Sequence, residues 1–181
     1  MARQLFVFDP PERFVAGTVG APGERTFYLQ ATGGGRTVSV ALEKPQVAVL
    51  AEKVRELLEE VRRRGIDVPI GAPRELEDVA PLDSPVEEEF RVGALALGFE
   101  VGDHMVVIEA QATTDGDAAE LDDDDPNGPD TLRVRVTPYT ALAFAARAAR
   151  VVEAGRPPCP LCGLPLDPNG HVCPRMNGFR R

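Results

Sequence analysis

The sequence predicts an α+β fold in which an antiparallel β-meander followed by a helix occurs twice. Short runs rich in β-branched and aromatic residues, separated by Gly, Pro and Asp, fill the first 43 residues and return after residue 88. One segment with apolar residues at helical spacing follows each group of runs. This order is typical of helices that pack on an antiparallel sheet.

The first meander is expected to contain four strands. They cover residues 5–8, 13–19, 26–31 and 37–42. The segments between them are short and contain the Pro and Gly residues that favour turns. Because connections of this length join neighbouring antiparallel strands, we expect all four to pair in chain order.

A helix is predicted over residues 45–64. Pro45 suits the first turn of a helix, where its missing N–H leaves no hydrogen bond unmade. Six apolar residues recur at helical spacing: Val47, Leu50, Val54, Leu57, Leu58 and Val61. Gly65 supplies the left-handed residue that commonly follows the end of a helix. We therefore expect this helix to cover one face of the sheet.

The second half is expected to repeat this pattern after a connector. The connector, residues 66–87, contains four prolines, and one helical turn is expected near Glu75. Strands are then predicted over residues 89–100, 104–113 and 132–136.

The second helix is predicted to begin after the last strand. Thr137 is a candidate N-cap and Pro138 suits the first helical position, while Gly155 supplies the stop. The segment before the last strand, residues 114–130, is rich in aspartate and nearly free of apolar residues. It cannot bury enough surface to offset the entropy of ordering, so a mobile acidic loop is expected there.

The pattern divides the chain into a body, residues 1–155, and a C-terminal tail, residues 156–181. Within the body, residues 1–65 form the first meander and helix, residues 66–87 the connector, and residues 88–155 the second meander and helix.

Composition and charge limit the function classes. The 181 residues are 43% hydrophobic and 27% charged, which is typical of a soluble globular chain. No apolar run approaches the roughly 20 residues that span a bilayer, and the start lacks a signal-peptide core. We therefore expect a cytoplasmic protein with no membrane partner.

The net charge of −9 disfavours nucleic acid as a partner. The charge is uneven, because residues 147–181 carry six arginines against two acids, a net charge of +4. This basic end either meets a phosphate-rich partner or contacts the acidic body of its own chain.

The three cysteines and one of the two histidines lie close together near the C-terminus. Cys159 and Cys162 form a C-x2-C pair, and after eight residues His171 and Cys173 form H-x-C. Three sulfurs and one imidazole suit a tetrahedral Zn²⁺ ion. An odd cysteine count in a cytosolic chain disfavours disulfides, and the Gly- and Pro-rich loop does not fit a helical redox motif. The sequence therefore predicts a small zinc-binding knuckle in which Zn²⁺ is structural.

No catalytic constellation is recognisable, and no catalytic residue is assigned. The chain lacks a nucleophile elbow, a phosphate-binding P-loop and an H-E-x-x-H zinc motif. Four residues near the first turns, Asp9, Glu12, Arg13 and Arg25, form a candidate ligand-binding group. Local hydrogen bonds and ion pairs within turns are the alternative explanation for them.

Several segments resemble a known family. Residues 8–20, with the sequence FDPPERFVAGTVG, and residues 25–31 and 42–44 carry the resemblance in the first half. At the end, residues 155–178 carry a zinc-ribbon-like motif, CPxCG followed by HxCPRxNG. They resemble a family of uncharacterised actinobacterial proteins that share a domain of unknown function. The resemblance covers nearly the whole chain except the acidic loop. It implies an intracellular bacterial protein and brings no established activity.

Together these observations favour a zinc-stabilised binding or adaptor protein of the cytoplasm. Its partner is expected to be another protein or a phosphate-bearing ligand. Two alternatives remain open. One is a hydrolase or transferase that acts on a phosphorylated or nucleotide substrate through the four residues named above, so the sequence leaves open whether the protein is an enzyme. The other is a single-stranded nucleic-acid-binding protein, although 6% aromatic residues offer few stacking platforms.

Overall fold

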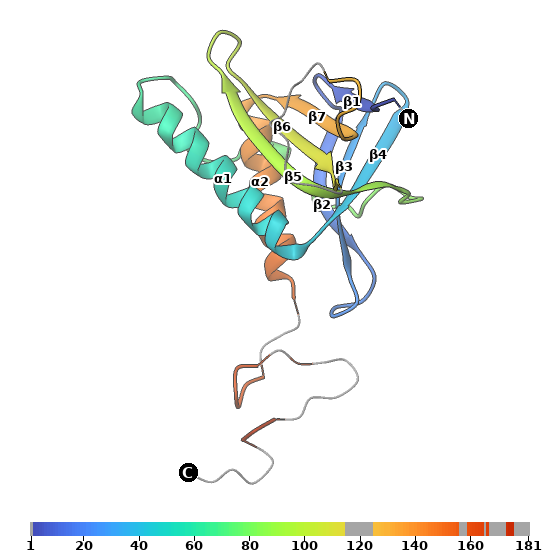
Figure 1. Cartoon of the computed structure of the whole chain (residues 1–181). Helices are drawn as coiled ribbons and strands as arrows, with labels where there is room; N and C mark the ends of the chain where they lie inside the picture. Colours follow the sequence, from blue (N-terminus) through green and yellow to red (C-terminus); the bar gives the residue numbers. More distant parts are fainter. Residues whose placement is uncertain (1, 115–124, 156–158, 165, 167–172, 176–181) are drawn as a thin grey trace.

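The strands that the structure describes join into one seven-stranded sheet, in the order β1-β7-β6-β5-β4-β3-β2 (Figure 1). The structure is a computed structural model of the chain. It describes residues 2–114, 125–155, 159–164, 166 and 173–175. The strands are β1 (Leu5–Phe8), β2 (Arg13–Val19), β3 (Thr26–Gly33), β4 (Arg36–Leu42), β5 (Glu88–Glu100), β6 (Met105–Ala112) and β7 (Thr131–Val136). The helices are α1 (Lys44–Arg63), the 3-10 turn η1 (Arg74–Leu76) and α2 (Pro138–Glu153).

The α+β class predicted from the sequence is confirmed. Every predicted strand and both predicted helices match an observed element to within two residues at each end, and η1 is the helical turn expected near Glu75. The second helix begins as predicted, because the Thr137 hydroxyl accepts a hydrogen bond from the backbone N–H of Thr140.

The pairing of the strands differs from a simple repeat in two places. β1 does not pair with β2 but runs parallel to β7, with Leu5 opposite Thr131. The first antiparallel meander therefore contains β2, β3 and β4 alone. β4 and β5 are also parallel, so the sheet is mixed.

One apolar core lies between the sheet and the two helices. α1 and α2 pack against each other, and each also contacts the sheet. The predicted stripe of α1 is buried except at Leu57, which is half-buried. On α2, the ring of Phe144 stacks on Phe14 of β2 with the ring centroids 4.4 Å apart. The sheet curls enough for Phe8 of β1 to contact Gly33 of β3.

The connector between the halves is fastened to the outer strand β2 and its neighbour β3. Leu82 lies directly over Gly17, where a Cβ atom would approach it to 2.5 Å. The Gln30 side chain donates to the carbonyl of Asp83 and accepts from its N–H. Because Cβ atoms and side chains point out of a sheet's plane, these contacts place the segment over one face of β2 and β3.

The predicted acidic loop lies mostly outside the described residues. In its described part, the carbonyl of Pro126 accepts a hydrogen bond from the N–H of Arg3, and the Asp130 carboxylate accepts one from the N–H of Gln4. Neither α1 nor α2, the long helices of the described chain, has the length and apolarity needed to cross a bilayer.

Candidate metal centre

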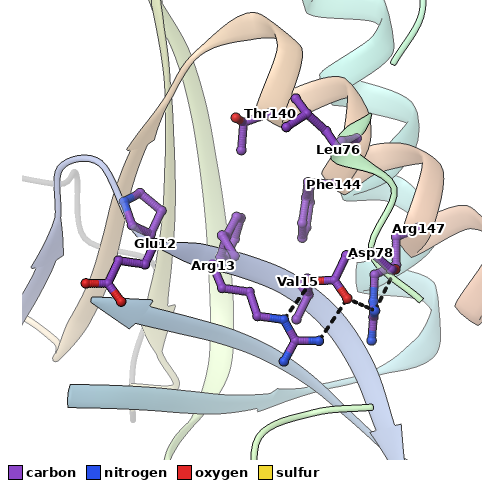
Figure 2. Close-up of a pocket in the computed structure, with 11 residues that line it drawn as sticks. Glu12, Arg13, Val15, Leu76, Asp78, Thr140, Phe144 and Arg147 are labelled. Atoms are coloured by element: carbon purple, nitrogen blue, oxygen red, sulfur yellow. Dashed lines mark hydrogen bonds and ion pairs between the residues drawn. The ribbon is translucent and has the colours of Figure 1, made fainter. Parts of the chain in front are cut away.

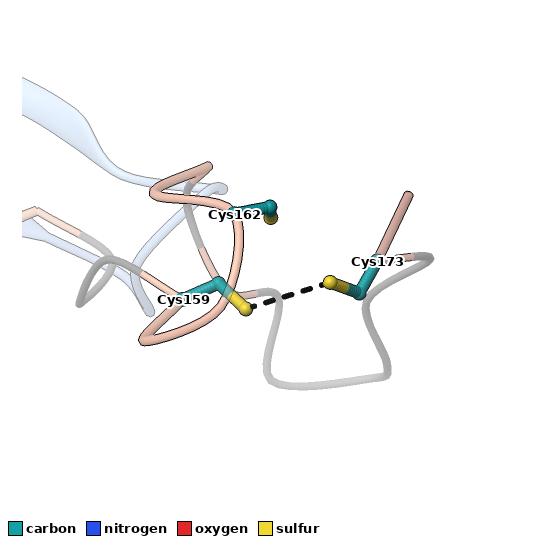
Figure 3. Close-up of side chains that lie close together, drawn as sticks. All are labelled: Cys159, Cys162 and Cys173. Atoms are coloured by element: carbon teal, nitrogen blue, oxygen red, sulfur yellow. Dashed lines mark hydrogen bonds between the residues drawn. The ribbon is translucent and has the colours of Figure 1, made fainter. Parts of the chain in front are cut away.

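The three cysteines predicted as ligands converge in space. The Sγ atoms of Cys159, Cys162 and Cys173 all lie within 4.8 Å of one another (Figure 3). The Sγ atoms of Cys159 and Cys173 are 3.9 Å apart, which is far longer than a disulfide bond. Cys159 and Cys173 are buried and Cys162 is half-buried. The group could therefore hold a metal ion through three sulfurs.

A tight turn explains why the first two cysteines face the same point. The N–H of Gly163 donates to the carbonyl of Cys159, and the N–H of Cys159 donates to the carbonyl of Leu164. Gly163 has a φ of +75°, a conformation that costs a residue with a Cβ atom roughly 1–2 kcal/mol. The glycine after the C-x2-C pair is thus required by the backbone of the turn.

The turn also prepares a thiolate. The backbone N–H groups of Cys162 and Leu161 lower the pKa of Cys159 to about 6. Burial raises the pKa of Cys162. A metal ion binds the thiolate form, so Cys159 is the ligand that is most readily available near neutral pH.

The donor set fits a soft or borderline metal ion. Thiolates select ions such as Zn²⁺ over Mg²⁺ or Ca²⁺, which prefer oxygen ligands. Three sulfurs leave one position of a tetrahedron for a further ligand. The residue that the sequence predicts there, His171, lies outside the described residues.

We call the described residues between 159 and 175 the cysteine segment. This segment exposes apolar side chains. Leu161 is 46% exposed and Leu164 is 49% exposed, and both lie within or beside the turn that carries Cys162. Leucines that pointed into a core would be covered, so packing contributes little to the order of this turn.

The four residues predicted as a ligand-binding group are not brought together. The Asp9 carboxylate lies 3.2 Å from the guanidinium of Arg135 on β7, whereas Arg13 lies on β2. Arg25 extends over the ring of Phe27, 5.6 Å from its centroid, and lines a different pocket from Arg13. Glu12 and Arg13 do line one pocket.

That pocket, of about 160 Å³, lies between β2, α2 and the connector (Figure 2). Arg13 makes two hydrogen bonds to the Asp78 carboxylate, at 2.7 and 3.0 Å, and an ion pair with Asp83. Arg147 of α2 reaches the same Asp78 carboxylate at 3.0 Å and also donates to the carbonyl of Ala16. The charges of this pocket are thus engaged with one another.

The Asp78 carboxylate, which Arg13 and Arg147 both contact, is stabilised in its charged form. Hydrogen bonds from Arg13 hold the pKa of Asp78 below its usual value, against the opposing effect of burial. Asp78 in turn raises the pKa of Arg13. Burial lowers the pKa of Arg147, whose exposed fraction is 7%. This arrangement clamps the connector onto β2 and α2.

Sequence reasoning missed Asp78 and Arg147 as partners. Arg147 lies toward the C-terminal end of α2, where the helix dipole favours a cation, so its position along the helix does not by itself call for a partner. Its neighbours gave a clue, because it comes three residues after Phe144 and one before Ala148, both on the buried face of α2. A cation on such a face requires an acidic partner from another segment.

Comparisons with known proteins add the family. The model of the family described as "Protein of unknown function (DUF3090)" matches residues 6–173. The matched region thus runs from β1 through the last of the three cysteines. No curated protein and no solved structure matches the chain.

Proposed function

The chain belongs to the DUF3090 family, and from that premise we propose that it is a zinc-stabilised binding protein, an adaptor that docks on its partner through the C-terminal cysteine segment. The observation that carries the proposal is the convergence of three cysteine sulfurs within 4.8 Å. The family match includes all three cysteines, so the body and the cysteine segment are parts of one family unit.

The ligand set supports zinc in a structural role. Zn²⁺ favours tetrahedral sites of sulfur and nitrogen and does not change its oxidation state. With His171 as the fourth ligand, as the H-x-C spacing predicts, every position around the ion would be taken by the protein. Such a closed site has no place for a substrate or a catalytic water, which is why the proposed role is structural.

The setting of the site supports the cytoplasm and a tail separate from the body. Free thiolates persist in a reducing compartment, whereas secreted chains tend to form disulfides. The hydrogen bonds of the Cys159 and Gly163 backbone stay within the segment. We therefore treat residues 1–155 as the body and residues 156–181 as the tail.

Exposed leucines support docking on another protein. Leu161 and Leu164 lie beside the cysteines and are each nearly half exposed. A metal ion would fix their backbone, so binding would not have to order this turn anew. The exposed Arg175 follows the last cysteine and adds a positive charge to the same segment. Apolar anchors with a basic neighbour suit a protein surface that is apolar and acidic.

The enzyme alternative does not gain from the described arrangement. A hydrolase or transferase built on Asp9, Glu12, Arg13 and Arg25 needs these side chains around one pocket. Asp9 pairs with Arg135 and Arg25 lines a separate pocket, so we do not propose it.

Metal analysis tests the first part of the proposal. The full chain, purified without a metal-affinity tag, is expected to contain one zinc ion per chain. Cys162→Ser removes one of the sulfur ligands and should lower the zinc content and the zinc affinity by at least about tenfold. A wild-type chain that carries no zinc, or a variant that binds zinc as tightly as the wild type, would contradict this part.

Cross-linking in the source cells tests the second part. The double variant Leu161→Ser, Leu164→Ser keeps the cysteines and should retain zinc but lose the cross-linked partner. The matched control is Val49→Ser, Val79→Ser, which removes two exposed apolar side chains from the body. The control should keep the partner. Equal cross-linking by the leucine variant and the control would rule out docking through this segment.

A further inference from the structure

A second pocket of the body, distant from the Asp78 ion pairs, collects positive charge. It has a volume of about 200 Å³ and is lined by Gly23, Arg25, Phe27, Lys44 and Gly155. Arg25 comes from the turn before β3, Lys44 is the first residue of α1, and Gly155 follows α2. Three segments far apart in the sequence thus meet at this point.

The two cations converge on one spot. A Cβ atom built on Gly155 would lie 3.5 Å from Nζ of Lys44 and 3.9 Å from Nη2 of Arg25. Arg25 is held in place because its guanidinium packs over the ring of Phe27. Gly155, which has no side chain, leaves open the space between the two groups.

No acid of the described chain neutralises this pair. Arg25 and Lys44 make no ion pair with any described carboxylate, although the chain carries a net charge of −9. Glu43, next to Lys44, is already engaged, because it pairs with Arg91 at 2.8 Å and caps α1. The C-terminal end of α2 offers roughly half a negative charge, which leaves most of the charge of two cations uncompensated.

We propose that Arg25 and Lys44 bind a phosphoryl group over Gly155. Arg25 offers a planar fork of donors and Lys44 a point charge, a combination that suits the several oxygens of a phosphate dianion. At about 200 Å³ the pocket has more room than a phosphate alone fills, so the first atoms of the group that a phosphate monoester carries would also fit. This inference deepens the proposed function by naming a ligand chemistry for the body.

The site and the metal centre can fail separately. Phosphate binding is measured at residues of the body, whereas zinc content is measured at the cysteines. A wild-type chain that binds phosphate but contains no zinc would refute the metal proposal alone. A wild-type chain that contains zinc but does not bind phosphate would refute the phosphate site alone.

Calorimetric titration of the zinc-loaded full chain with inorganic phosphate tests the site. We expect saturable binding of one phosphate per chain in the millimolar range or tighter, at moderate salt. Arg25→Gln and Lys44→Gln should each weaken binding by about tenfold or more, since each removes a charge-assisted contact. Arg62→Gln removes the same charge from an exposed position at the other end of α1 and should leave binding unchanged.

Substitutions of Gly155 make the test independent of the cations. Gly155→Asp would place a carboxylate between Arg25 and Lys44, so it should abolish phosphate binding without lowering the melting temperature. Gly155→Ala, whose Cβ atom would lie 3.5 Å from Nζ of Lys44 and 3.9 Å from Nη2 of Arg25, fills part of that space without adding charge and should weaken phosphate binding less than Gly155→Asp does. A parallel titration with glycerol phosphate distinguishes the sources: equal or tighter binding indicates a monoester, and binding of inorganic phosphate alone indicates the free ion.

Two results would overturn the inference. One is a wild-type chain that shows no saturable binding of either phosphate compound. The other is binding that persists unchanged in Arg25→Gln, Lys44→Gln and Gly155→Asp.

Discussion

The body and the cysteine segment are held together by different forces. The body has a continuous core that includes Phe14, Leu29 and Phe144, all nearly inaccessible to water. The cysteine segment has three converging thiols and leaves Leu161 and Leu164 about half exposed. Burial of apolar surface therefore stabilises the first region, whereas in our proposal metal coordination orders the second.

This difference shows how a short segment can have a defined surface without a core. Fully burying one leucine contributes roughly 1.5–3 kcal/mol. Binding of zinc to a small structural site contributes roughly 10–16 kcal/mol at neutral pH. If the cysteines bind zinc as proposed, the metal term exceeds anything that two half-exposed leucines supply, so the order of the segment would not depend on burying them.

Removal of the metal should separate the two regions most clearly. A strong chelator is expected to abolish amide protection over Cys159–Leu164 while the amides of β3 and β6 stay protected. The reason is that, in our proposal, the metal holds the segment and the apolar core holds the body. Hydrogen exchange with mass spectrometry measures both regions in one experiment. Unfolding of the body on chelation would show that the two regions are coupled.

A cavity in the core should destabilise the body and leave the metal site of the cysteine segment unchanged. Phe144→Ala removes a buried ring that stacks on Phe14, and should lower the free energy of unfolding of the body by about 3–5 kcal/mol. Zinc content should not change. Chemical denaturation and metal analysis of the same preparation provide the two values. A zinc content that falls together with the stability of the body in Phe144→Ala would argue against separate stabilisation.

Loss of the shared carboxylate tests the clamp on the connector. Asp78→Asn leaves Arg147, which is 7% exposed, without its anionic partner and should destabilise the body by about 3 kcal/mol at neutral pH. Glu56→Gln removes an exposed carboxylate that pairs with Lys53 on α1; it is the control and should have a much smaller effect, because both partners of that pair are exposed to water. Similar losses from both variants would mean that the clamp contributes no more than a surface ion pair.

The same variant should change how stability depends on pH. Hydrogen bonds from Arg13 lower the pKa of Asp78 in the folded state. The stabilisation is therefore complete above the unfolded-state pKa of about 4, and it is lost as the pH falls through the lower folded-state pKa. The difference in stability between wild type and Asp78→Asn should shrink across that acid range. Denaturation midpoints at several pH values measure it, and a difference that grows toward low pH would contradict the assignment.

The smallest expected effect concerns the turn of the metal site. Gly163→Ala forces a residue with a Cβ atom to adopt a φ of +75° and should cost about 1 kcal/mol, which is roughly a fivefold loss of zinc affinity. Gly98→Ala in β5 is the matched control, because its φ is not positive and a Cβ atom there meets no neighbour. Competition with a metal indicator gives both affinities. Unchanged zinc affinity in Gly163→Ala would mean that the turn is not needed to present the sulfurs.

Local patterns in the sequence predicted the elements but not all of their pairings. The spacing of Val47, Leu50 and Val54 was enough to place α1 and its buried face, because helical periodicity is a local property. The partner of β1 is β7, more than 120 residues away, and no local pattern reports such a pairing. The parallel contact between β4 and β5 was missed for the same reason.

The candidate sites show the same difference between what a local pattern predicts and what depends on contacts between distant segments. The C-x2-C spacing predicted that two sulfurs would face one point, because a short turn determines it. Grouping Arg25 with Arg13 rested on nearness in the sequence, whereas the fold carries Arg25 to Lys44 and Gly155 instead. The pairing of Asp78 with Arg147 spans the connector and α2, so it depends on the tertiary structure.

X-ray absorption at the zinc edge of the full chain is the most direct test of coordination by the cysteine segment. We expect three sulfur neighbours at about 2.3 Å and one nitrogen neighbour at about 2.0–2.1 Å. We also expect Cys173→Ser to remove one of the sulfurs. A zinc-free chain, or a zinc ion surrounded by oxygen and nitrogen without these sulfurs, would contradict this expectation.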